Sequence, residues 1–282
     1  MTEVQEIELN MLKQVLGICD ELGLVYYMVC GSVIGAVKYK GFVPWDDDID
    51  IALPRRDYEI FCENAQKMLP EYYFLQNYKT DPAFPTIYSK LRDSRTAFIE
   101  TPTADLPINH GIYIDIFPLD GYPSEHGMIK RFEKKKKLLK LLMISSCKNN
   151  NEQKALTKAL LSVFRLFGFH RKTNATAEKL TNYLSRWQLE KSEIWCNHGN
   201  WQGELEYAPR EQYGEGIWAE FEGLNVRIPQ KYDEYLTQKY GDWRAELSKE
   251  KQISHHVYEV CDTQKSYTEY IKQEYKSAKR FI

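Results

Sequence analysis

Apolar residues recur every three or four positions over residues 3–22, which predicts an amphipathic helix near the start of the chain. Gly23 follows the last apolar position and is expected to end this helix. The β-prone apolar run LVYYMVC at 24–30 then predicts a buried strand. Gly31-Ser32 interrupts that run, and VIGAVKYK at 33–40 is expected to form a short helix.

Further β-prone runs predict strands at residues 48–53, 72–76, 86–92, 96–100 and 111–121. Two of these runs alternate with period two. In DIDIAL, Asp48 and Asp50 share one face of the strand, and the intervening isoleucines share the other. In GIYIDIFPLDG, Asp115 shares a face with two aromatic residues, and Pro118 is expected to end the strand.

Helical spacing predicts three further helical regions. Pro54 is expected to open a helix that runs to about Met68. Residues 124–190 have a helical and basic pattern, and residues 231–243 predict a helix that ends at a glycine.

Two remaining stretches give weaker patterns. Residues 209–223 are aromatic and loop-like in composition, and the tail from Asp262 is expected to form a solvated helix. A change of character near Tyr122, from an acidic α/β part to a basic helical part, suggests a boundary there. We therefore predict two domains, 1–122 and 123–282.

Composition adds a charge asymmetry to this outline. The 282 residues are 43% hydrophobic and carry a net charge of −2, which gives no reason to expect a nucleic-acid partner. Between Ser124 and Lys172, however, 13 Lys or Arg residues stand against 3 Asp or Glu residues. A basic block inside an otherwise acidic chain suggests a face for an anionic surface.

The sequence also points to a cytoplasmic protein. No basic, apolar signal peptide and no long apolar run for a membrane span is apparent. The six cysteines are scattered without a CxxC pair, which is typical of reduced thiols.

The acidic run WDDDIDIAL predicts a metal site. If the strand of Asp48 and Asp50 neighbours that of Asp115, three carboxylates converge, and a divalent cation would relieve their repulsion. Oxygen ligands of this kind suit Mg²⁺ or Mn²⁺. An EF-hand is excluded, because a loop beginning at Asp46 lacks the required glycine and glutamate. A solvated acidic loop is the remaining alternative.

The Gly31-Ser32 turn, between a strand and a helix, predicts a phosphate site. Glycine allows a phosphate close to the backbone, and the helix start and the Ser32 hydroxyl supply donors. Lys38 and Lys40 are candidates to add charge to the same phosphates, or they lie at a solvated helix end. A phosphate cradle beside paired aspartates suggests metal-assisted phosphoryl-group chemistry.

At these residues the chain resembles the LicD family. The resemblance rests on GSVIGAVKYKGFVPWDDDIDIALPRRDYE, with SKLRDSRT, GIYIDIFPLDGYP and IPQKYDEYLTQKYGDW in support, and covers about residues 20–245. It implies an α+β nucleotidyltransferase (polymerase-β-like) core with a mixed sheet, shared with fukutin-related glycan enzymes. The helical C-terminal part would complete the site. The basic segment 124–190 matches no block of the family.

The resemblance implies a phosphotransferase that moves phosphocholine from CDP-choline to a glycan such as a teichoic acid or lipopolysaccharide precursor. Gly31 and Ser32 match the phosphate positions, and Asp48, Asp50 and Asp115 match the metal positions. Another CDP-activated alditol phosphate as donor, true nucleotidyl transfer, and a glycan- or nucleotide-binding module on an inactive core stay open as alternatives.

Further residues are candidates for the substrate. Because choline is a quaternary ammonium, aromatic faces suit it, and Trp45, Tyr113 and Phe117 are candidates, with ordinary packing as the alternative. Lys90 and Arg92 share a strand face and are candidates for the diphosphate, with a salt-bridged strand edge as the alternative.

The basic segment raises a separate membrane hypothesis. An apolar stripe along 156–167, with basic residues on other sides, is typical of an interfacial helix. A lipid-linked acceptor would place the protein at the inner membrane face. The alternative is a helical bundle that packs on the core with its basic side in water.

Overall fold

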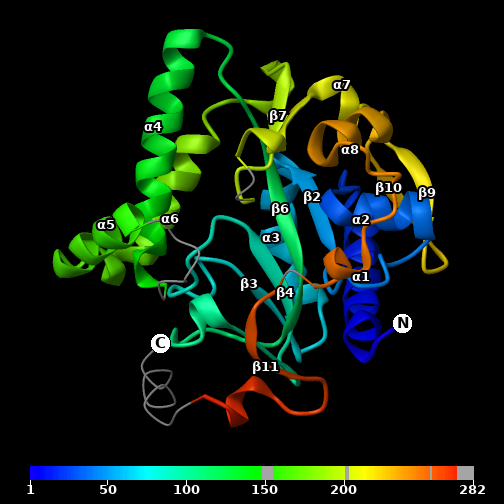
Figure 1. Ribbon diagram of the computed structural model, residues 1–282, viewed down its shortest axis with the longest axis horizontal. Coiled ribbons are helices and arrows are strands. Elements are labelled where there is room, and N and C mark those ends of the chain that lie inside the picture. Colours follow the sequence, from blue (N-terminus) through cyan, green and yellow to red (C-terminus); the bar gives the residue numbers. More distant parts are fainter. Residues whose placement is uncertain (148–154, 201–202, 255, 272–282) are drawn as a thin grey trace. The chain divides into compact units, whose positions relative to one another are not determined.

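The computed structural model describes residues 1–147, 155–200, 203–254 and 256–271 (Figure 1). The chain forms two compact units, each assembled from segments that are distant in sequence. The first unit comprises residues 1–69, 114–125 and 185–256, and the second comprises 70–113, 126–184 and the described residues from 257 onward. The two compact units do not coincide with the predicted domains 1–122 and 123–282, because each unit combines segments from both. The functional division at residue 122 stays a prediction.

The first unit is built around a mixed sheet. Strand β1 (Tyr27–Met28) pairs antiparallel with β2 (Asp50–Pro54), and β2 pairs parallel with β6 (Ile112–Gly121). The end of β6 continues antiparallel to β7 (Ile194–Cys196), which pairs with β8 (Tyr207–Pro209). Both parallel and antiparallel pairs occur, so the predicted mixed sheet of an α+β protein is confirmed.

Helices and one hairpin complete the first unit. They are α1 (Glu3–Leu22), α2 (Cys30–Ile34) with the π-helix Gly35–Tyr39, α3 (Arg55–Met68), α7 (Arg210–Tyr213), α8 (Tyr232–Tyr240) and the hairpin of β9 (Ile217–Phe221) and β10 (Leu224–Ile228). The predictions of α1, α3 and α8 are confirmed. Helix α1 begins with a capping box between Thr2 and Gln5, and the left-handed Gly23 ends it.

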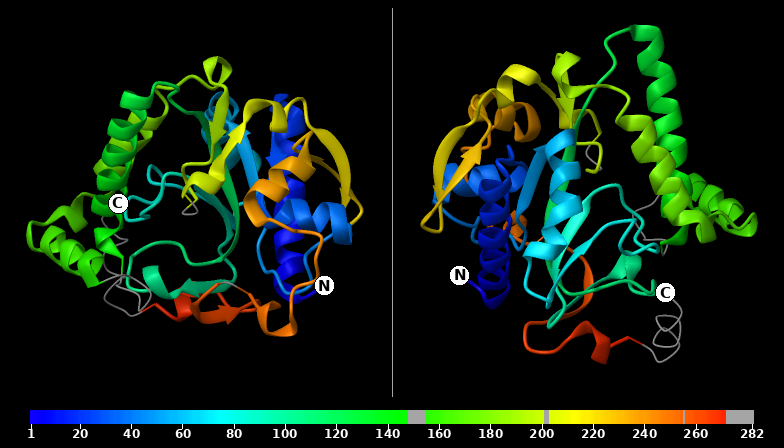
Figure 2. Two further views of the ribbon diagram at one scale, coloured as in Figure 1. Left: turned by 45° about the horizontal axis from the view of Figure 1, so that its top comes forward. Right: turned by 180° about the vertical axis from the view of Figure 1, so that it is seen from behind.

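The second unit contains short strands and three longer helices. Strands β3 (Tyr73–Gln76) and β4 (Ser89–Asp93) pair antiparallel, as do β5 (Ala97–Glu100) and β11 (Tyr258–Asp262). The helices are α4 (His126–Met143), α5 (Ala155–Leu166) and α6 (Thr173–Leu184). Helices α4 and α6 lie side by side in Figures 1 and 2. The predicted helical character of 124–190 is confirmed for its described residues.

Three local predictions were wrong. Pro118 does not end β6, which continues to Gly121. The backbone N–H of Asp115 donates to the carbonyl of Ile49, the residue just before β2, at 2.9 Å. Successive backbone N–H groups along a strand point to opposite sides. The nitrogen of Pro118 therefore faces away from β2, where a missing N–H does not interrupt that pairing. Residues 209–223 are not loop-like throughout, because they include α7 and β9.

The third wrong prediction concerns the tail. Residues 263–271 form turns and a 3₁₀ segment, Tyr267–Glu269, rather than the start of a helix, and the rest of that predicted helix lies outside the described residues. No helix in the described part of the chain has the length and apolar character to cross a membrane. All six cysteines lie within the described ranges, and none of them forms a disulfide there.

A buried ion pair within the first unit joins α3 to β6. The Arg55 guanidinium donates from Nε and Nη2 to the two carboxylate oxygens of Asp120, at 2.7 and 2.6 Å. Both side chains are largely withdrawn from solvent. Removing one partner would leave the other charge buried and uncompensated, which is costly.

We therefore expect Arg55→Met to lower the free energy of unfolding by about 3 kcal/mol. The neighbouring Arg56 is exposed, so Arg56→Met is a matched control that should change it by less than about 0.5 kcal/mol. Urea unfolding of both variants measures the difference. Equal stability of the two variants would contradict a structural role for the pair.

Candidate active site

Strands β2 and β6 bring carboxylates from distant parts of the sequence together. Asp50 opens β2 and stands opposite Asp115 in the parallel register. Paired residues on neighbouring strands point to the same face of a sheet and lie about 5 Å apart, so their carboxylates are neighbours. Both residues are buried. The predicted convergence of these two strands is therefore confirmed, whereas the ligand roles of the residues stay predictions.

The loop before β2 adds three more carboxylates to this cluster. The backbone carbonyl of Asp46 accepts a hydrogen bond from Gln5 of α1 at 2.8 Å. The Asp47 carboxylate accepts from Ser254 at 2.6 Å and contacts His256 Nδ1 at 2.9 Å, and His256 Nε2 lies 3.7 Å from Asp48. A segment more than 200 positions away in sequence thus holds the loop.

Burial and mutual repulsion disturb the acidity of this cluster. Burial, followed by the charges of Asp48 and Asp115, raises the pKa of Asp50 well above its usual value, and the opposing influence of Lys239 is smaller. Burial, followed by Asp48, raises the pKa of Asp46 to about 8. Burial and nearby acids also raise the pKa of Asp48. The cluster therefore favours a bound positive charge.

Asp47 behaves differently from its neighbours. Burial acts to raise its pKa, but the hydrogen bonds from His256 and Ser254 outweigh that effect and lower it. Asp47 is thus stabilised as a carboxylate by its own partners, whereas Asp46, Asp48 and Asp50 are not compensated to the same degree.

Glu8 of α1 joins the cluster and was not predicted. Its side chain is buried, and its Oε2 has no hydrogen-bond partner among the described residues. Burial, followed by Asp48 and the other aspartates, raises its pKa well above the usual value. The sequence did carry a signal, because Gln5 and Glu8 are polar residues at helical spacing on the face that also buries Leu9 and Leu12.

The Gly31-Ser32 turn lies directly against the cluster. A Cβ at Gly31 would come within 2.9 Å of Asp46 Oδ2, so only glycine fits without displacing that carboxylate. Ser32 Oγ accepts the backbone N–H of Asp50 at 2.9 Å, which ties the turn to β2. Gly31 and Ser32 were predicted to separate a strand at 24–30 from a helix at 33–40. In the structure β1 already ends at Met28, and both residues lie in the first turn of α2.

Strain precedes this turn. Cys30 adopts a left-handed φ of 54°, which is unfavourable for a residue other than glycine. Its N–H donates to the Tyr235 hydroxyl of α8 at 3.0 Å. Nearby, the buried side chains of Lys239 and Glu206 form an ion pair. Helix α8 therefore supports the backbone that leads into Gly31.

Lys38, Lys40 and Trp45 lie in the first unit but have other partners. Lys38 pairs with Glu246 at 2.9 Å and donates to the Arg244 carbonyl at 3.0 Å. Lys40 is exposed and lies 3.4 Å from Glu220. The Trp45 ring packs edge-on against Tyr39, with 6.1 Å between ring centroids. Their substrate roles stay predictions.

Three of the other predicted residues form a buried group in the second unit. Lys90 and Arg92 pair with Glu100, at 3.1 and 3.2 Å, and Tyr113 donates to the same carboxylate at 3.0 Å. Lys90 Nζ also sits 3.2 Å above the Tyr113 ring centroid. These contacts favour the salt-bridge alternative for the two cations. Phe117 is buried in β6 of the first unit.

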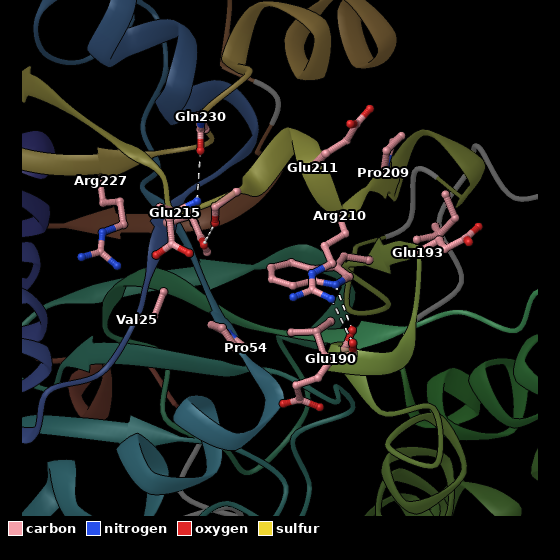
Figure 3. A pocket seen from close by; sticks show the side chains of 15 residues that line it. Val25, Pro54, Glu190, Glu193, Pro209, Arg210, Glu211, Glu215, Arg227 and Gln230 are labelled. Atoms are coloured by element: carbon pink, nitrogen blue, oxygen red, sulfur yellow. Dashed lines mark hydrogen bonds between the residues drawn. The ribbon is translucent and has the colours of Figure 1, made fainter.

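A separate pocket of about 830 Å³ opens at the other end of β2 (Figure 3). Pro54 and Val25 line it, together with Glu190, Arg210 and Arg227. At about 3.3 Å per residue, the two ends of β2 lie about 13 Å apart. Because its lining includes none of the clustered aspartates, this pocket is distinct from the carboxylate cluster.

The donor set of the cluster fits a hard divalent cation in its chemistry. All donors are carboxylate oxygens, which suit Mg²⁺ or Mn²⁺. Within the described ranges, no three His, Cys, Asp or Glu side chains already stand in ligating geometry. Asp48, Asp50 and Asp115 are the residues predicted to hold such an ion, and their roles as ligands stay a prediction.

Fold and site together define an α+β protein with a carboxylate centre on two parallel strands. Residues 23–141 match the family model described as LicD/FKTN/FKRP, nucleotidyltransferase domain. The chain is also 30% identical, over 92% of its length and 97% of the relative, to the lipopolysaccharide cholinephosphotransferase LicD of Haemophilus influenzae. The chain belongs to the LicD family, as its motifs had predicted.

The raised pKa values imply a pH dependence of stability. A carboxyl group whose pKa is higher in the folded than in the unfolded protein binds more protons when folded, so its deprotonation destabilises the fold. Without added cation, we expect the free energy of unfolding to fall between about pH 5 and the pKa of about 8 at Asp46. Each such group contributes at most about 1.4 kcal/mol per pH unit.

Asp46→Asn tests the raised pKa of Asp46. Because asparagine does not titrate, the free energy of unfolding of this variant should fall less between pH 5 and pH 8 than that of the wild type. Asp20→Asn, on the exposed side of α1, should show the same fall as the wild type. Urea unfolding at several pH values measures the slopes. An identical slope in Asp46→Asn and the wild type would contradict the raised pKa.

Proposed function

We propose that this protein transfers phosphocholine from CDP-choline to a sugar hydroxyl of a cell-surface glycan precursor and releases CMP. The observation that carries the proposal is the carboxylate cluster on β2 and β6. This cluster lies in a chain 30% identical over nearly its whole length to a lipopolysaccharide cholinephosphotransferase. The acceptor class extends to teichoic acid precursors.

The reaction needs an electrostatic centre more than a covalent catalyst. The acceptor oxygen attacks the phosphorus that bears choline and forms a new P–O bond. The bond between this phosphorus and the bridging oxygen breaks, and CMP departs with that oxygen. A divalent ion at Asp48, Asp50 and Asp115 would neutralise phosphate charge. The protein's own contribution is to place Asp50 and Asp115 on adjacent strands, with Asp48 in the loop before β2, before substrate binds.

Gly31 and Ser32 would hold the donor phosphates beside the carboxylates. The absence of a side chain at Gly31 keeps the backbone accessible next to Asp46. Because Ser32 Oγ accepts a hydrogen bond from Asp50, its own proton remains to be donated to a phosphate oxygen. The turn and the carboxylates are therefore one connected assembly.

Asp115 is our candidate for accepting the proton of the sugar hydroxyl. It is the carboxylate that β6 contributes to the cluster, and it lies opposite Asp50. A carboxylate that lies within hydrogen-bond reach of the sugar hydroxyl acts as a general base by taking its proton during the attack. We also propose a cytoplasmic location, which the free cysteines support.

We expect Asp50→Asn and Asp115→Asn each to lower CMP release from CDP-choline by about a thousandfold, because each removes a carboxylate that would hold the cation at the transferred phosphoryl group. The assay contains Mg²⁺, CDP-choline and a lipopolysaccharide or teichoic acid precursor. Asp20→Asn, remote on the exposed side of α1, should retain the wild-type rate.

The products discriminate among the alternatives. Phosphocholine on the glycan supports the proposal. Faster transfer from another CDP-activated alditol phosphate than from CDP-choline would instead assign the protein to that donor. Pyrophosphate release from a nucleoside triphosphate would indicate nucleotidyl transfer, which the description of the family model favours as the second candidate. Binding of CDP-choline without turnover would indicate a binding module.

Cation binding can be tested without substrate. We expect Mg²⁺ or Mn²⁺ to raise the melting temperature of the wild type, and the increase to grow with pH because the ion binds deprotonated carboxylates. Asp50→Asn should lose most of this increase, and Asp20→Asn should keep it. A cation-independent melting temperature at pH 8 would contradict the metal proposal.

A further inference from the structure

Helix α5 and Phe167, the residue that follows it, present a row of large apolar side chains to solvent. Leu156, Leu160, Val163, Leu166 and Phe167 are 82%, 37%, 47%, 83% and 72% exposed. We call these five residues the apolar stripe. Single exposed leucines are ordinary on a protein surface, but a contiguous group of this size marks a contact surface.

The opposite side of α5 is attached to the protein. At about 100° per residue, Leu161 and Arg165 project away from the centre of the stripe. Leu161 is buried, and Arg165 donates to the carbonyls of Ser145 and Cys147, at 2.7 and 2.5 Å. Helix α5 is thus held by one side within the second unit while the apolar stripe faces outward.

Positive charge surrounds the stripe in the sequence. The chain between Ser124 and Lys172 holds 13 Lys or Arg residues and only 3 Asp or Glu residues. Arg171 and Lys172, just beyond the end of the stripe, are exposed, as are Lys134, Lys135 and Lys137 of α4. Few of these charges are neutralised within the segment itself.

We propose that the apolar stripe inserts into the interfacial region of an anionic lipid bilayer, with the surrounding basic residues on the lipid headgroups. Apolar insertion and attraction to anionic lipid act together in membrane-bound helices of this kind. A protein partner fits the surface less well, because lysine is depleted at protein–protein interfaces. The exposed apolar stripe therefore favours the interfacial helix over the packed bundle, the two alternatives that the sequence had left open.

This membrane surface is independent of the proposed reaction. It involves neither the aspartate cluster nor the Gly31-Ser32 turn, and it can be measured without donor or acceptor. A failure of the choline-transfer assay therefore leaves the membrane test intact, and the reverse also holds.

The test is flotation of the full chain with two kinds of vesicle. One contains phosphatidylcholine alone, and the other contains phosphatidylcholine with one third phosphatidylglycerol. We expect retention on the anionic vesicles at low salt, and at least about tenfold weaker binding for Leu166→Ser combined with Phe167→Ser. Arg171→Gln combined with Lys172→Gln should weaken binding roughly fivefold for each charge removed.

Matched controls separate lipid contact from a general loss of surface hydrophobicity. Leu205 and Leu247 are 44% and 45% exposed and lie outside the basic segment 124–172. Leu205→Ser combined with Leu247→Ser should leave vesicle binding unchanged. Circular dichroism checks that each variant is folded. If Leu166→Ser with Phe167→Ser does not fold, Arg171→Gln with Lys172→Gln still tests the proposal.

Two results would overturn the proposal. The first is no retention of the wild type on anionic vesicles at low salt. The second is a wild-type dimer in sedimentation that Leu166→Ser with Phe167→Ser converts to a monomer while vesicle binding is absent. That outcome would assign the stripe to a second copy of the chain.

Discussion

The repulsion among buried carboxylates is the constraint around which the first unit is organised. The register of β2 against β6 fixes Asp50 beside Asp115, and the loop before β2 adds further acids. Such an arrangement costs folding free energy, since each carboxylate raises the proton affinity of its neighbours. It persists because the hydrophobic residues around it, such as Ile49 and Ile51, determine the register independently of the charges.

Local sequence pattern predicted those parts of the fold that local interactions determine. Helix α1 has a regular apolar face and both caps, and its predicted bounds agree with the structure. Strand β9 escaped prediction because Ile217 and Trp218 are exposed and no buried alternation marks it, whereas β10 (LNVRI) does alternate and buries Val226 and Ile228. The turn between β9 and β10 did carry a signal in Glu222-Gly223, both of which have positive φ values, as tight hairpin turns require.

The candidate site shows the same limit. The aspartates on β2 and β6 could be predicted, because strand alternation places them on one face. Nothing local predicts that His256 and Ser254 hold Asp47, since that contact spans more than 200 residues. Charged residues on a strand face are also ambiguous: Lys90 and Arg92 gave the pattern of an anion site, yet the Glu100 carboxylate already pairs with both of them. Sequence alone does not show which counter-charge is already present.

The backbone before Gly31 suggests how precision in this site is maintained. A left-handed conformation at Cys30 costs on the order of 1 kcal/mol or more, and a glycine would avoid that cost. A glycine would also loosen the chain just where the turn must approach Asp46 closely. The Tyr235 hydrogen bond and the packing of α8 hold the strained conformation instead. Helix α8 therefore acts on the site through backbone geometry, so a residue that does not touch the carboxylates can still determine where the Gly31-Ser32 turn lies.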